Sequence, residues 1–102
     1  MRFNGTEGEE ITIEEAAVMT ASYRTANPGA VIANYIGKDL IRTILAQEGC
    51  MGIRTYHALN TDGSKEIVLV GCDAEGNDLL KVIVDRSIPC PNMCAKPNKL
   101  NS

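Results

Sequence analysis

Aromatic side chains are scarce in this chain. Its 102 residues include no tryptophan, one phenylalanine and three tyrosines. The core must therefore be built from aliphatic side chains, which bury less area each than aromatic rings do. A chain of this length also buries only roughly 60% of the surface that it exposes when unfolded. We therefore expect association with other copies to supplement a thin core.

Basic residues are too few and too dispersed for a nucleic-acid surface. Ten Lys and Arg residues stand against thirteen Asp and Glu residues, so the net charge is -3 at pH 7. Domains that bind nucleic acid concentrate positive charge on one face or along one helix. No such stripe is present, and we expect no nucleic-acid partner.

Long apolar runs are missing as well. No segment approaches the roughly 18 apolar residues of a membrane-crossing helix. The first ten residues are polar and acidic, which is the opposite of a signal peptide. We therefore expect a cytoplasmic protein with reduced cysteines, no membrane partner and no cofactor.

The pattern of the chain predicts one α+β domain. Residues 1–10 form a flexible arm, residues 11–86 form the domain, and residues 87–102, which are rich in Pro and Asn, form an extended tail. Two helices are expected at 11–27, where Thr12 and Glu15 match a capping box, and at 38–48. Strands are expected at 30–36, 51–60, 65–73 and 79–85. The last of these could also be a short helix, although its β-branched residues favour a strand.

The predicted fold has two helices packed on an antiparallel sheet of three or four strands, in the order α-β-α-β-β-β. The hairpin turn at Asp62 and Gly63 joins the second and third strands, and in the register that this turn sets, His57 faces Val68. The run Ile67–Val70 is apolar at every position, which indicates a central strand that needs cover on both faces. With both helices on one face, the other face is left for a second copy or another partner.

Four cysteines and one histidine are the candidates for metal or thiol chemistry. Cys90 and Cys94 lie four residues apart, with Pro89 and Pro91 stiffening the chain around Cys90, and with His57 they could hold a soft metal ion. Free thiols are the favoured interpretation in a reducing compartment, and a disulfide and a metal site remain the alternatives. No local motif supplies an orienting group or an oxyanion site for catalysis at His57.

Three tyrosines fit an interface better than an active site. Tyr23, Tyr35 and Tyr56 are amphipathic side chains of the kind enriched in protein interfaces. The sequence therefore favours a non-enzymatic assembly or binding module, self-associating through the sheet face and the terminal arms. The alternative is a metal- or thiol-dependent protein that uses Cys90 and Cys94.

Three segments together resemble a small group of uncharacterised bacterial proteins of about this length. They read NPGAVIANYIGKDLIRTILAQEGCMGIR, LVGCDAEGNDLL and IPCPNMC. The resemblance extends from the first helix to the tail and implies a bacterial, stand-alone domain. It brings no activity, ligand or site.

Overall fold

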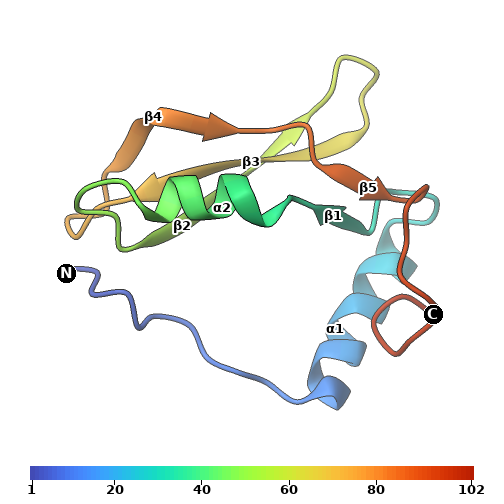
Figure 1. Cartoon of the computed structure of the whole chain (residues 1–102). Helices are drawn as coiled ribbons and strands as arrows, with labels where there is room; N and C mark the ends of the chain where they lie inside the picture. The colour runs from blue at the N-terminus through green and yellow to red at the C-terminus, as the bar shows by residue number, and fades with distance from the viewer.

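The computed structural model describes residues 1–102 and has two helices and two antiparallel sheets (Figure 1). The elements in chain order are α1 (Ile13–Ala26), β1 (Ala33–Tyr35), α2 (Lys38–Leu45), β2 (Gly52–Leu59), β3 (Lys65–Cys72), β4 (Asp78–Val84) and β5 (Ile88–Cys90). The predicted α+β class is confirmed. Residues 79–85 are a strand, as favoured, and the structure adds one strand, β5, to the predicted order.

The larger sheet has the order β2-β3-β4, so β3 is central as the run Ile67–Val70 predicts. The β2–β3 register is regular over eight residues, from Gly52 opposite Cys72 to Leu59 opposite Lys65. The β3–β4 register shifts between Val70 and Gly71. This irregularity bends β4 against its neighbour, as bulges do.

The hairpin register differs from the prediction by one residue. The sequence placed His57 opposite Val68, but His57 lies opposite Ile67. The loop is longer than the Asp62–Gly63 turn alone: Asn60 donates its backbone N–H to the Ser64 carbonyl at 2.8 Å. The Asp62 side chain stabilises the loop, because its Oδ1 accepts a hydrogen bond from the backbone N–H of Ser64 at 2.9 Å.

Helix α2 covers one face of this sheet. Ile44 is fully buried and packs with Leu69 and Val84, which forms the small core. Gly71 also lies under the helix, because a Cβ built there would meet Ile44 Cγ2 at 3.2 Å. Residues 67, 69 and 71 of β3 therefore share the α2 face, since side chains alternate along a strand.

Helix α1 does not pack on the three-stranded sheet beside α2, contrary to the prediction. Its start is as expected: Thr12 accepts the Glu15 backbone N–H at 3.1 Å. However, none of its residues is buried, and Val18 and Met19 are largely exposed. In Figure 1 the helix stands apart from the sheet, beside the C-terminal segment. The apolar residues at helical spacing in α1 are too small and scattered to hold it on the sheet.

The smaller sheet joins β1 to β5, which lies in the segment predicted to be an extended tail. Ala33 pairs with Cys90 and Tyr35 with Ile88. The two sheets meet at a polar junction. Asn34 Nδ2 donates to Ser87 Oγ at 2.9 Å and to Glu66 Oε1 at 3.3 Å, and the Ser87 hydroxyl donates to the same carboxylate.

The folded chain exposes much more surface than a compact monomer of the same mass. Its accessible surface is 7658 Å², against about 5,600 Å² for a monomeric protein of this mass. Its radius of gyration is 15.2 Å, against about 12.8 Å for a compact domain of this length. The two sheets, the separate helix and the N-terminal arm thus leave the molecule open.

Candidate functional site

The face of the larger sheet opposite α2 is covered by neither helix. We call it the open face, and it carries Tyr56 of β2, Val68 and Val70 of β3, and Ile83 of β4. Tyr56 lies opposite Val68, and Ile83 lies opposite Val70. Tyr56 is 46% exposed and Ile83 is 57% exposed. An apolar centre flanked by an exposed tyrosine is the composition of an interface core.

A polar cluster borders the open face at the β3–β4 turn. Arg54 donates to Asp78 Oδ1 at 2.6 Å and to the Gly76 carbonyl at 3.0 Å. The Tyr56 hydroxyl donates to the other oxygen of Asp78. The thiol of Cys72 lies 3.4 Å from Asp78 Oδ1. Asp78 therefore receives hydrogen bonds from three side chains and ties β2, β3 and β4 together on this face.

These contacts and the burial of the cluster shift the pKa values of all four groups. The Tyr56 hydrogen bond lowers the pKa of Asp78, and the carboxylate in turn raises the pKa of Tyr56 and of Arg54. Burial raises the pKa of the Cys72 thiol. At neutral pH Asp78 is charged and Cys72 is a neutral thiol, which is a poor nucleophile. The cluster is suited to positioning the Tyr56 ring rather than to covalent chemistry.

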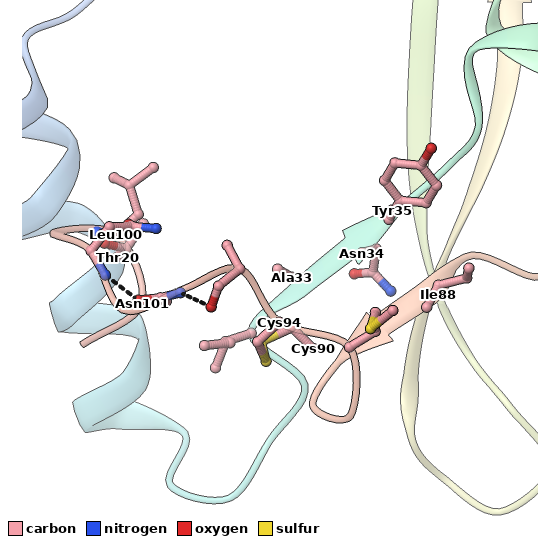
Figure 2. A pocket seen from close by; sticks show the side chains of 13 residues that line it. Thr20, Ala33, Asn34, Tyr35, Ile88, Cys90, Cys94, Leu100 and Asn101 are labelled. Carbon is pink, nitrogen blue, oxygen red and sulfur yellow. Dashed lines mark hydrogen bonds between the residues drawn. A yellow bond between two sulfur atoms is a disulfide. The ribbon is translucent and has the colours of Figure 1, made fainter.

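A second feature is an apolar hollow of about 540 Å³ between α1, the β1–β5 sheet and the C-terminal segment (Figure 2). Thr20 and Leu100 line its α1 side, and Tyr35 and Ile88 line its opposite side. The Cys90–Cys94 pair forms part of the wall between them. The hollow is large enough for a small ligand or a partner side chain.

The three tyrosines predicted as interface residues lie in three different places. Tyr56 is on the open face, and Tyr35 lines the hollow. Tyr23 lies on α1, where its hydroxyl accepts from Lys65 Nζ at 2.7 Å. The lysine nitrogen is also 4.7 Å from the ring centroid, within the range of a cation–π contact. Tyr23 thus joins α1 to β3, and only Tyr56 lies on the uncovered sheet face.

Of the three predicted metal ligands, Cys90 and Cys94 lie together, and His57 lies apart from them. Cys90 and Cys94 form a disulfide with a Cα–Cα distance of 4.8 Å, so they are not the free thiols that the sequence favoured. His57 lines a separate hollow with Tyr23 and Glu66. No group of three or more His, Cys, Asp or Glu side chains is placed to hold a metal ion. A metal- or thiol-dependent role for the cysteine pair stays a prediction.

Both chain ends contact the folded body. Phe3 donates its backbone N–H to the Ala74 carbonyl at 2.8 Å, and its ring lies against Gly76. At the other end, Arg24 of α1 donates to the carbonyls of Leu100 at 2.6 Å and Ser102 at 3.2 Å. The segment predicted to be a flexible arm is therefore held near its start, beside the turn between β3 and β4.

Sequence reasoning missed Arg54, Asp78 and Ile83 as residues of this surface. A usable signal was present for Arg54, because it stands two residues before Tyr56 and so shares its face of β2. No local sequence pattern identifies Asp78, because its partner Arg54 is 24 residues away in the chain. Ile83 could be assigned to a face only once the shift between Val70 and Gly71 was known.

Comparisons with protein-family models, with curated proteins and with solved structures found no match. Neither helix is long and apolar enough to cross a bilayer. The function of the chain must therefore be argued from its own geometry.

Proposed function

We propose that this protein is a non-enzymatic assembly module whose copies associate through the open face, with the terminal arms adding contacts. The observation that carries the proposal is the surplus of exposed surface. The chain exposes 7658 Å², which is about 2,000 Å² more than a monomeric protein of its mass. A standard interface buries about 800 Å² of each partner, so the surplus is enough for a stable contact between copies.

The open face is the part of this surface best prepared for a partner. Ile83 projects from β4 with more than half of its side chain exposed, next to the buried Val70. Tyr56 stands on the other side of β3, with its hydroxyl fixed by Asp78. A ring held in place before binding loses little rotamer freedom on association. The face therefore combines an aliphatic centre with a preordered aromatic side chain.

A second copy of the chain is the partner that this arrangement supports best. In a two-fold contact the same patch meets itself, so an apolar patch that lacks unpaired charge is self-complementary. On the open face, the charge of Arg54 is paired with Asp78 at 2.6 Å. Glu66, on the same side of β3, keeps its carboxylate against Asn34 and Ser87 at the junction with the smaller sheet. A contact centred on Val70 and Ile83 therefore buries no unpaired ion. The assembly then covers Tyr56 and Ile83, the exposed side chains on either side of the central strand.

Size-exclusion chromatography with light scattering tests the proposal. We expect a mass that is a multiple of 11.0 kDa and that falls on dilution. Ile83→Lys places a charge in the contact and should weaken association by about tenfold or more, because burying an unpaired charge is costly. Leu80→Lys is the matched control, since Leu80 is an exposed residue of the same strand beside Gln47. A wild-type protein that stays monomeric at every concentration would refute the proposal.

A further inference from the structure

The outer edge of β2 is long, regular and unpaired. β2 is an end strand of its sheet, and its eight residues pair with β3 without a register shift. Its sequence contains no proline and no lysine, and its single charge, on Arg54, is neutralised by Asp78. Proteins normally protect edge strands with such residues or with bulges, because an open edge is a template for another strand.

The other end strand, β4, has the protection that β2 lacks. Lys81 stands in its middle, and the register shift between Val70 and Gly71 breaks its regular course. A charged, irregular strand is a poor template for pairing. The two edge strands of the sheet thus differ, and only β2 has a regular edge without a protecting lysine or register shift.

The direction of the β2 backbone groups identifies the free donors. The Asn60 N–H points toward β3, because it bonds to Ser64 at 2.8 Å. Alternate residues of an edge strand point toward and away from their neighbour. The N–H and C=O groups of Ile53, Thr55 and His57 therefore point outward. The N-terminal arm does not use them, because its one backbone hydrogen bond to the rest of the chain joins Phe3 to Ala74 in the β3–β4 turn.

We propose that β2 pairs antiparallel with β2 of a second copy and so continues the sheet across a two-fold axis. In such a ladder, outward-pointing residues must face outward-pointing residues. Near the centre of the strand, Thr55 then lies opposite either Thr55 or His57 of the second copy. The product is one sheet of six strands, three from each copy. Tyr56 lies next to the axis, and the two open faces become one continuous surface.

This edge contact adds to the face contact of the proposed function and rests on it. The surplus surface is more than twice what one standard interface takes from each partner, so it accommodates two contacts. The axis of the edge contact runs perpendicular to the sheet, and the axis of the face contact runs parallel to it. Where the two axes intersect, the contacts close into an assembly of four copies with D2 symmetry. Each copy then uses its open face toward one neighbour and its β2 edge toward another.

Thr55→Lys tests the edge without touching the open face. Thr55 is exposed, so the substitution leaves the core intact. In the paired ladder it brings a lysine close to the two-fold axis on each copy, and the like charges repel. We expect wild type and the Leu80→Lys control to form four-copy particles by light scattering. Thr55→Lys and Ile83→Lys should each reduce these to two-copy particles. High salt should partly restore the Thr55→Lys assembly, because it screens exposed charges.

Amide hydrogen exchange gives an independent measure. In the wild-type assembly, the Thr55 and His57 amides should exchange about tenfold or more slowly than in the Thr55→Lys variant. The Tyr56 amide, which points toward β3, should be protected in both and serves as the internal control.

The outcomes separate the two proposals. A monomeric wild type refutes the assembly function itself. If the wild type associates, Ile83→Lys lowers the particle mass and Thr55→Lys leaves it unchanged, only the edge contact is refuted. If Thr55→Lys and Leu80→Lys lower the particle mass equally, the edge contact is also refuted, because added charge alone would then explain the effect.

Discussion

The position of Gly71 under α2 provides a sharp test of which sheet face is covered. A Cβ at this residue would lie 2.9 Å from Cys50 Sγ and from Gln47 Nε2, and 3.2 Å from Ile44 Cγ2. Cβ contacts below 3.0 Å are essentially never found, so Gly71→Ala forces its neighbours to move. Gln47 is flexible, but Ile44 is fully buried and has no free space to enter.

The expected cost follows from overpacking a filled core. Adding a methyl group where side chains already touch destabilises proteins by about 1–3 kcal/mol. For a domain near this length, about 1 kcal/mol shifts the melting temperature by roughly 4–8 °C. We therefore expect Gly71→Ala to lower the melting temperature by about 5–20 °C, measured by circular dichroism at one fixed protein concentration.

Gly52→Ala is the matched control. Gly52 is also a strand residue, and a Cβ built there meets no atom within 4 Å. Replacing such a glycine restricts the unfolded chain and is expected to be neutral or to stabilise by about 0.4–1 kcal/mol. If Gly71→Ala proved as stable as Gly52→Ala, α2 would not lie over β3 as described. The distinction between covered and open faces, and the assembly proposal with it, would then fail.

Two further perturbations address the polar cluster and the cysteine pair. The folded pKa of Asp78 lies below its ordinary value of 3.8. The ionised group therefore stabilises the fold above that value, and the contribution is lost as the pH falls through the lower, folded pKa. Asp78→Asn should flatten this acid limb in denaturant unfolding between pH 5 and 2; an unchanged slope would contradict the role of the carboxylate. Replacing Cys90 and Cys94 together by serine removes a cross-link with a sequence separation of 4, and should cost about 2 kcal/mol by loop entropy. Equal unfolding midpoints for the oxidised protein, the reduced protein and the double variant would show that the bond does not stabilise the fold.

The larger sheet was predictable because its signals are local. Thr12 begins α1 through a hydrogen bond to Glu15, a pattern readable over four residues. Ile67–Val70 is apolar at every position, which favours a strand with a neighbour on each side, and β3 does lie between β2 and β4. The register of His57 was missed by one residue, since the loop from Asn60 to Ser64 closes outside the Asp62–Gly63 turn.

The smaller sheet was not predictable, because its determinants are distant in sequence. Pro89 marked the segment as non-strand, yet β5 is a three-residue strand at an edge, where proline is tolerated. The position of α1 depends on contacts such as Lys65 with Tyr23 and Arg24 with Leu100, which periodicity does not reveal. The candidate site was predicted only in part. The need for a partner on one sheet face followed from Ile67–Val70, whereas the pairing of Arg54 with Asp78 required the fold.

The polar junction between the sheets has an entropic consequence. Asn34 and Ser87 are 53 residues apart, so their hydrogen bond closes a loop that contains α2 and the whole larger sheet. Closing a loop of this length costs about 3.5 kcal/mol of chain entropy. The few hydrogen bonds between β1 and β5 return a similar amount, at about 0.5–1.5 kcal/mol each. The ladder alone therefore roughly balances the cost of its own loop. The hydrogen bonds of Asn34 and Ser87 to Glu66, and those of Arg24 to the C-terminal residues, add to the stability of the closed chain.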